Sequence, residues 1–218
     1  MNTLAKFNTF LHCGRLQPGI LGTMKRISFA LTHDPEWIEK LKLVCEMTNN
    51  VQDLEISALD SNQLPAETLR GIHLSKLTAL TALNVDHTVL REVLINHPNL
   101  NTIYIGESLC HGSSCPLRRI YFKHPIAIYG GSSCLVGLLT KNTIVGMGVA
   151  IHTERDYKCT PARIMKLLHV GSVGRTLNSL YIQFRHHDGN VLRTISHGCQ
   201  NLILLRLENI GTLAVNLF

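Results

Sequence analysis

The feature that most constrains the fold of this chain is a short hydrophobic pattern that returns along most of its length. The pattern is apolar-x-x-apolar-x-apolar, as in Val51–Ile56 (VQDLEI) and Leu177–Ile182 (LNSLYI). Its copies start at residues 24, 51, 80, 100, 117, 144, 177 and 202, and the copy at 144 is the weakest. A unit with one strand cannot bury its own apolar face, so such units are expected to stack into a solenoid.

The spacing of the copies supports this reading. The intervals between successive starts are 27, 29, 20, 17, 27, 33 and 25 residues, and five of them lie within the roughly 20–29 residues of one class of one-strand repeats. The interval of 17 is short and the interval of 33 is long, so the copy at 117 is either degenerate or wrongly registered. The alternative is a set of ordinary half-buried strands in an α/β domain. The solenoid is favoured because the copies share both their spacing and the sequence that precedes them.

Helical patterns precede several copies. Asp34 is a suitable N-cap with Pro35 at the first helical position, and apolar residues follow at helical spacing until Asn49 and Asn50 end the segment. Similar patterns cover about 89–95, 161–168 and 189–198. The expected unit is therefore helix, short turn and strand.

Two copies have a more specific resemblance. The segments His97–Ile105 (HPNLNTIYI) and Gly198–Leu207 (GCQNLILLRL) resemble the turn and strand of the cysteine-containing leucine-rich repeats found in F-box and related adaptor proteins, including fungal ones. Cys199 matches the cysteine of that family, and His97 replaces it in the earlier copy. The resemblance implies an α/β fold, a leucine-rich-repeat solenoid shaped as a right-handed horseshoe, with parallel strands on the concave face and helices on the convex face.

The domain organisation predicted is one irregular solenoid over 1–218, with 1–23 as a degenerate N-terminal repeat or cap. Leu64–Ile72 (LPAETLRGI) resembles the opening of an F-box, but the only tryptophan, Trp37, lies upstream and no second or third F-box helix follows. We therefore interpret the segment as a repeat helix opened by Pro65. The apolar end at 213–218 lacks the polar cap of a solenoid, as a fragment of a longer chain would.

Composition favours the cytoplasm or the nucleus. Hydrophobic residues make up 45% of the chain, no stretch is apolar enough to predict a membrane span, and no secretory signal is recognisable. The seven cysteines are scattered and odd in number, so we expect free thiols, several of them in the core.

Charge is divided unevenly along the chain. Residues 1–109 contain 9 Lys and Arg against 11 Asp and Glu, whereas residues 110–218 contain 12 against 4. A basic half of this kind suits nucleic acid, an acidic protein or a phosphorylated tail. The basic residues form no run and accompany no recognised nucleic-acid motif, so a nucleic-acid-associated protein is the alternative function and solvated repeat surface is the simpler explanation.

Motifs for catalysis or cofactor binding are weak. Cys110, His111, Cys115, His124 and Cys134 could in principle hold zinc, but no Cys-x-x-Cys pair is present and the spacing suits a connecting loop better. His186-His187 is interpreted as a loop, and Gly171–Thr176 lacks the lysine and the spacing of a phosphate-binding loop. We predict no enzyme activity, no cofactor and no metal.

The predicted function rests on the strand residues that point out of the core. The residue between the last two apolar positions of each copy points outward. These residues are Ser28, Glu55, Asn84, Tyr104, Tyr121, Tyr181 and Arg206, and the next outward positions include Lys123, Gln183 and Glu208. Tyrosine and arginine are frequent interface anchors, although tyrosine is also common on half-exposed strands.

We therefore predict a non-catalytic protein-interaction module. Its concave face is expected to bind a protein partner through the candidate residues Tyr104, Tyr121, Lys123, Tyr181, Gln183 and Arg206. By resemblance alone, the module would select substrates for an F-box-type ubiquitin-ligase adaptor, and ligase scaffold subunits would be partners if a longer form carried an F-box. No membrane partner is expected.

Overall fold

The computed structural model describes most of the chain. The described residues are 4–32, 34–58, 66–106, 115–131, 138–139, 141–150, 166, 168–169, 173–184 and 190–209. Their helices and strands are, in order, α1 (Leu4–Leu16), α2 (Pro18–Thr23), β1 (Arg26–Leu31), α3 (Pro35–Met47), β2 (Asp53–Ala58), η1 (Ala66–Leu69), β3 (Ala79–Leu83), α4 (His87–Asn96), β4 (Thr102–Ile105), η3 (Pro116–Arg119), β5 (Ile126–Gly131), β6 (Ile144–Ala150), α8 (Val173–Thr176), β7 (Ser179–Phe184), α9 (Val191–Gly198) and β8 (Leu204–Asn209).

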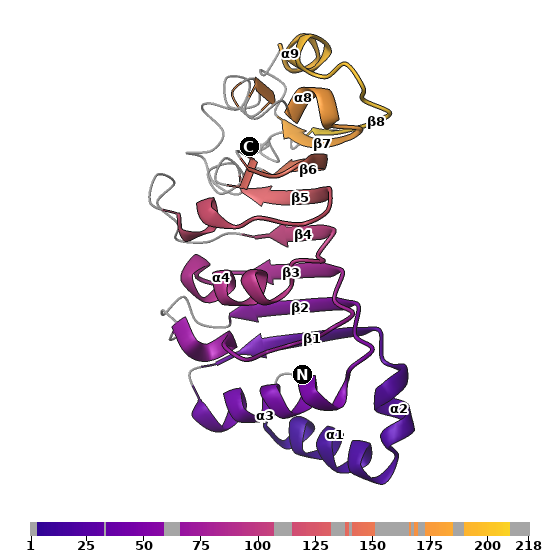
Figure 1. The fold of residues 1–218 in the computed structure, drawn as a ribbon, viewed down its shortest axis with the longest axis vertical. Coiled ribbons are helices and arrows are strands. Elements are labelled where there is room, and N and C mark those ends of the chain that lie inside the picture. The colour runs from indigo at the N-terminus through magenta and orange to yellow at the C-terminus, as the bar shows by residue number, and fades with distance from the viewer. Residues whose placement is uncertain are drawn as a thin grey trace, which may run out of the picture.

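The strands form one parallel sheet in sequence order. The order is β1-β2-β3-β4-β5-β6-β7-β8, and each strand pairs in parallel with the next one along the chain. Helices and turns are interleaved between the strands, so the chain advances along one axis and does not cross back (Figure 1). This arrangement confirms the predicted α/β class and the leucine-rich-repeat type of solenoid.

Each strand contributes one apolar residue to the same buried column. The column contains Ile27, Leu54, Leu80, Ile103, Ile128, Met147, Leu180 and Leu205, each in register with the next. All except Leu205 are at most 4% exposed. Burial of a Leu or Ile side chain is worth roughly 1.5–3 kcal/mol. The stacked column is therefore the main support of the sheet.

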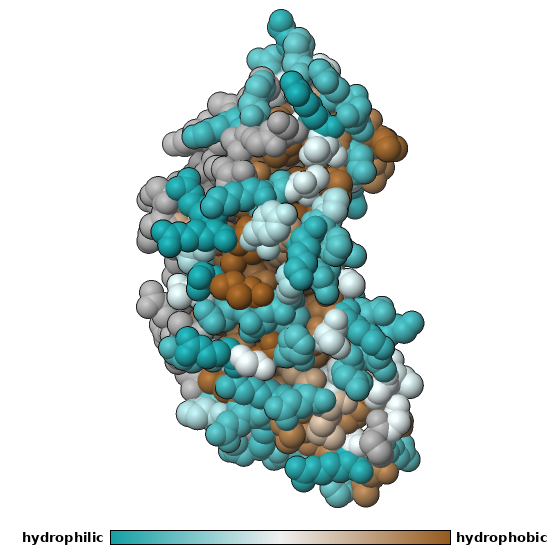
Figure 2. Space-filling model, in the orientation of Figure 1, coloured by the Kyte–Doolittle hydropathy of each residue, from teal (hydrophilic) through white to brown (hydrophobic). Residues whose placement is uncertain are grey.

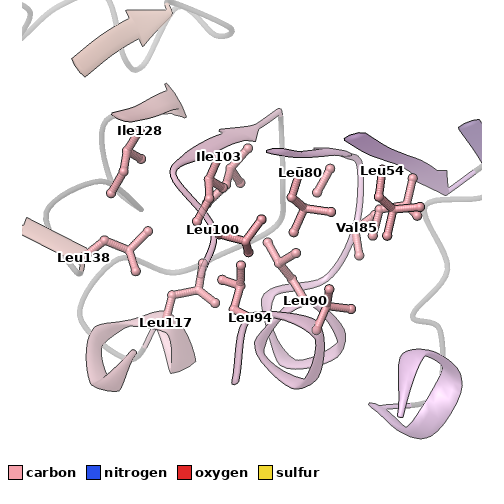
Figure 3. Packing of buried hydrophobic residues seen from close by; sticks show 14 of the residues in the cluster. Leu54, Leu80, Val85, Leu90, Leu94, Leu100, Ile103, Leu117, Ile128 and Leu138 are labelled. Carbon is pink, nitrogen blue, oxygen red and sulfur yellow. The ribbon is translucent and has the colours of Figure 1, made fainter. Parts of the chain in front are cut away.

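Residues from the helical layer complete the core. Figure 3 shows the strand residues Leu80, Ile103 and Ile128 on one side and Leu90, Leu94, Leu117 and Leu138 opposite them. The helices thus cover one face of the sheet. The other face, which we call the concave face, points away from them. The outline of the molecule is hollowed along one long edge, between the α1–α2 end and the β7–β8 end (Figure 2).

The helix α3 begins where the sequence predicts, whereas α4 begins at His87, two residues before the predicted segment of about 89–95. The Asp34 carboxylate accepts a hydrogen bond from the backbone N–H of Glu36 at 2.9 Å, and Pro35 opens α3. Asp86 caps α4 in the same way, through the N–H of Thr88 at 2.6 Å. Each cap satisfies a backbone donor that has no partner inside the helix. The helices α3, α4 and α9 confirm three of the predicted helical segments.

Two helices, α1 and α2, precede the first strand. They lie at the β1 end of the sheet and contact α3 (Figure 1). Leu11 of α1 is 7% exposed and Leu21 of α2 is 3% exposed. Leu11 belongs to the core cluster, so α1 covers the end of the core beside β1.

The predicted register of the third repeat is wrong by three residues. The predicted pattern, Leu80-x-x-Leu83-x-Val85, places Leu83 and Val85 inside the strand. In the structure Leu80 and Ala82 point inward, and the strand ends at Leu83. Asn84 follows with a φ of 57°, which turns the chain out of the sheet, so it does not belong to the outward strand positions.

The predicted strand of the copy at 117 is also wrong. Leu117 lies in η3, and Ile120 and Phe122 are buried in the segment between η3 and β5. The strand is β5, eight residues later than predicted, with Ile128 in the buried column. The spacing from Ile103 to Ile128 is 25 residues (128 minus 103), so the irregular interval of 17 disappears.

Several predictions fall outside the described residues. These are the helix over about 161–168, of which only 166 and 168 are described, and the proposed helix opening at Asp188. Leu64 and Pro65, which begin the F-box-like segment, also lie outside the described residues. Its later part, Ala66–Leu69, forms the short 3-10 helix η1.

Candidate binding surface on the concave face

The outward residues of the strands form parallel columns on the concave face. The central column is Ser28, Glu55, Thr81, Tyr104, Tyr129, Gly148, Tyr181 and Arg206, from β1 to β8. The strand pairing therefore places Tyr104 beside Tyr129, and separates Tyr129 from Tyr181 by one glycine. We call Tyr104, Tyr129 and Tyr181 the tyrosine strip.

Tyr129 is the member of the strip that sequence reasoning missed. The wrong register at β5 placed Tyr121 in the column instead. In the structure Tyr121 precedes β5 and is 66% exposed, whereas Tyr129 pairs with Tyr104 on one side and Gly148 on the other. Lys123 lies in the turn before β5 and is exposed, so it is not a strand residue either. The signal that could have found Tyr129 is the 25-residue spacing from Ile103 to Ile128.

The ring of Tyr129 lies against the glycines of β6. A Cβ built on Gly148 would stand 2.2 Å from Cδ1 of Tyr129, and one built on Gly146 would stand 3.3 Å from its hydroxyl oxygen. Both glycines face the concave side in the register of the sheet. The absence of two side chains thus makes room for the ring to lie across β6.

Tyr181 is held from the opposite side by residues of β8. Its hydroxyl donates a hydrogen bond to Glu208, which also accepts one from the Gln183 amide at 3.4 Å. The guanidinium carbon of Arg206 lies 5.2 Å from the centre of the Tyr181 ring, a cation–π geometry. The predicted residues Tyr181, Gln183 and Arg206 are therefore brought together, with Glu208 as their shared partner.

This network changes the pKa of two of its members. Burial, and next the hydrogen bond to Glu208, raise the pKa of Tyr181 above its ordinary value. The same hydrogen bond is the main reason why the pKa of the Glu208 carboxyl is lowered. At neutral pH the pair is therefore a neutral phenol and a carboxylate, which fixes the orientation of the ring.

Among the described residues, the outward strand positions carry charged side chains only on β1, β2 and β8, at the two ends of the concave face. On β1 and β2, Arg26 forms ion pairs with Asp53 at 3.4 Å and with Glu55 at 3.1 Å. From β3 to β7 the outward strand positions carry no Lys, Arg, Asp or Glu. The tyrosine strip is therefore an uncharged surface of tyrosine, glycine and small polar residues between two charged ends.

The candidate metal and phosphate residues are not assembled in the described part of the chain. Cys110, His111, Cys134, His186 and His187 lie outside it. Cys115 is buried and its Sγ lies 3.3 Å from Nδ1 of His87. No group of three potential metal ligands occurs among the described residues, which leaves the prediction of no metal untested.

Basic residues dominate the described part from 115 onward. They are Arg118, Arg119, Lys123, Lys141, Lys166, Arg175, Arg193 and Arg206, against the single acidic residue Glu208. Only Arg206 belongs to a strand. The ion pairs found among the described residues all lie between residues 26 and 92. The excess positive charge thus lies mainly on turns and helices.

The chain matches no protein-family model, and no curated protein and no solved structure is detectably similar to it. Its class is therefore defined by its own architecture, a leucine-rich-repeat solenoid of parallel strands with an uncharged tyrosine strip. In the described part of the chain, no helix has both the length and the apolar character that a membrane span requires.

Proposed function

We propose that this chain is a non-catalytic protein-interaction module that binds a partner protein on its concave face. The observation that carries the proposal is the tyrosine strip: Tyr104, Tyr129 and Tyr181 are half-buried, lie in one column and are held by the sheet beneath them. A tyrosine that is already fixed loses little conformational freedom on binding, and it offers both apolar area and a hydroxyl.

The proposal is tested by affinity capture with matched variants. The test variant replaces Tyr104, Tyr129 and Tyr181 with Ala, and the control variant is Tyr121→Ala, which removes an exposed tyrosine outside the strip. We expect the same set of proteins to be recovered by the wild type and the control and to be lost in the triple variant. Equal recovery by all three, with unfolding midpoints unchanged, would overturn the proposal.

A finer proposal is that the module selects substrates for an F-box-type ubiquitin-ligase adaptor. Its support is the resemblance of the turns at His97 and Cys199. Both residues lie six positions before the strand residue of the buried column, Ile103 and Leu205 respectively (103 minus 97; 205 minus 199). Recovery of ligase scaffold subunits in the capture experiment would support this extension. Their absence from a capture that recovers other strip-dependent proteins would remove it.

The second candidate function is association with nucleic acid through the basic half. The excess of Lys and Arg among the described residues after 115 favours it. Such binding weakens steeply as salt increases, because cations are released from the phosphates. Nucleic-acid affinity that falls with salt and survives the triple tyrosine variant would support this candidate, and salt-independent or absent binding would exclude it.

A further inference from the structure

We infer that the tyrosine strip binds an uncharged, proline-containing segment in the polyproline II conformation. The inference rests on the proposed function, because it names the kind of partner segment that the concave face would take. Its structural basis is the combination of a flat aromatic surface, hydroxyl groups that make no hydrogen bond, and the absence of charge.

The tyrosine strip has a broad, flat shape. The ring of Tyr129 lies across Gly146 and Gly148, as the 2.2 Å approach of its Cδ1 to a Cβ on Gly148 shows. Leu83 at the end of β3 lies in a similar way against Gly106, which directly follows β4, because a Cβ on Gly106 would stand 2.8 Å from Cδ2 of Leu83. Glycine thus lets these side chains lie along the sheet and present a broad face. Proline rings pack well on such aromatic surfaces.

Two hydroxyls of the strip are available as hydrogen-bond donors. In the part of the chain that the structure describes, the hydroxyls of Tyr104 and Tyr129 make no hydrogen bond, whereas the Tyr181 hydroxyl donates to Glu208. A polyproline II segment has no internal hydrogen bonds, so its carbonyl oxygens are available as acceptors. The hydroxyls of Tyr104 and Tyr129 can donate hydrogen bonds to these carbonyl oxygens, while the tyrosine rings offer apolar surface.

The central part of the column is uncharged. The positions between Glu55 on β2 and Arg206 on β8 carry no charged side chain. The charges at the two ends already interact within the chain, Arg26 with Asp53 and Glu55 and Arg206 with Tyr181. A charged segment would be desolvated there without gaining a counter-charge, which is unfavourable. An uncharged segment meets no such cost, so the strip favours it over an acidic peptide or a nucleic acid.

The spacing of Tyr129 and Tyr181 matches the repeat of polyproline II. Tyr129 and Tyr181 lie in the same column two strands apart, which is about 10 Å at the usual strand separation. One turn of polyproline II contains three residues and advances by about 9 Å. A segment that crosses the strands therefore places residues i and i+3 against Tyr129 and Tyr181. The matching sequence is Pro-x-x-Pro, with the two intervening residues between the two tyrosines.

The test uses short fluorescent peptides and the whole chain. The first probe is Pro-Ala-Ala-Pro-Ala-Ala-Pro with blocked termini, and the second has the same composition with its three prolines adjacent. We expect fluorescence anisotropy to show binding of the first probe, about tenfold weaker binding of the second, and no change with added salt. Tyr129→Ala and Tyr181→Ala should each weaken binding about tenfold or more, and Tyr121→Ala should leave it unchanged.

Other outcomes overturn the inference. Equal affinity for the two proline probes would show that spacing does not matter, and an unchanged affinity in Tyr129→Ala would place the site elsewhere. Tighter binding of a glutamate-rich peptide or of oligothymidylate than of the first probe would show that charge selects the partner. Failure of all proline probes would overturn the inference alone, because loss of captured proteins in the triple tyrosine variant would still support the proposed function.

Discussion

The imidazole of His97 accepts a hydrogen bond from the backbone N–H of Leu74 at 2.9 Å, while its other nitrogen donates to the carbonyl of Val93 at 2.7 Å. Asn142 makes the same two kinds of bond further along the solenoid. It accepts from the N–H of Phe122 at 2.8 Å and donates to the carbonyl of Leu138 at 2.7 Å. In both places a buried polar side chain forms hydrogen bonds with the backbone of its own repeat and with the backbone of the preceding repeat.

The His97 contacts predict that acid destabilises the protein. Burial, assisted by the neighbouring His73, lowers the pKa of His97, although the bond to Val93 acts in the opposite direction. Because the unfolded chain takes up this proton near pH 6.5 and the folded one resists it, stability should be full above about pH 7.5. It should fall below that by up to about 1.4 kcal/mol per pH unit, until the folded-state pKa is reached.

The matched variant for this prediction is His97→Asn, which copies the arrangement of Asn142. Urea unfolding at several pH values should give a weaker decline between pH 7 and pH 5 for the variant than for the wild type. The difference between the two curves isolates His97 from the other histidines. Curves that run parallel over this range would show that His97 does not titrate on unfolding.

Two glycines on neighbouring strands predict unequal costs of one added methyl group. Gly130 has a φ of 144°, and a Cβ there would stand 2.0 Å from the carbonyl oxygen of Ile105, which is backbone and cannot move away. Gly148 faces only the ring of Tyr129, which can rotate outward. We expect Gly130→Ala to cost more than about 3 kcal/mol of unfolding free energy and Gly148→Ala less than about 1.

Urea unfolding midpoints measure both effects. Gly148→Ala should in addition weaken the Pro-Ala-Ala-Pro-Ala-Ala-Pro probe, because it displaces the ring of Tyr129 without removing the tyrosine. Similar destabilisation by the two substitutions would contradict the geometry of β5 and β6.

Much of the fold could be predicted from the sequence because local and repeat signals agree there. Asp34 and Pro35 mark the start of α3, and the inward residues of β1, β2, β4, β6, β7 and β8 follow the repeated pattern. The register of the third repeat was predicted wrongly because two registers fit the sequence equally well. The small residue Ala82 fills the inward position that the pattern assigned to a larger one, and it is 2% exposed.

The strand β5 could not be predicted for a different reason. Its inward positions include Ile128 and then Gly130, and no hydrophobic pattern selects a glycine there. A glycine is needed because the neighbouring backbone of Ile105 leaves no room for a side chain. That restriction exists only in the assembled sheet. The wrong strand also affected the candidate site. Tyr104, Tyr181, Gln183 and Arg206 lie at outward strand positions as predicted, but the prediction named Tyr121 in place of Tyr129.

The buried thiol of Cys45 should resist alkylation. Desolvation, and next the neighbouring Glu46, raise the pKa of Cys45 to about 12, so that its reactive thiolate is scarce at pH 8. Cys13 is exposed and provides the comparison. Iodoacetamide followed by peptide mass spectrometry should show early labelling of Cys13 and labelling of Cys45 only in denaturant. Early labelling of Cys45 in the native protein would show that α3 opens readily.

The contact between Tyr181 and Glu208 predicts a measurable change in the titration of the tyrosine. The hydrogen bond to the carboxylate contributes to the raised pKa of Tyr181, although burial contributes more. Replacing the carboxylate by an amide removes the negative charge that opposes formation of the phenolate. Glu208→Gln should therefore lower the pKa of Tyr181 part of the way toward its ordinary value. Carbon-13 NMR of labelled tyrosines resolves this residue, and Glu55→Gln, at the far end of the same column, is the control. If both variants titrate as the wild type does, Glu208 does not hold the ring of Tyr181. The tyrosine strip would then not be fixed by β8.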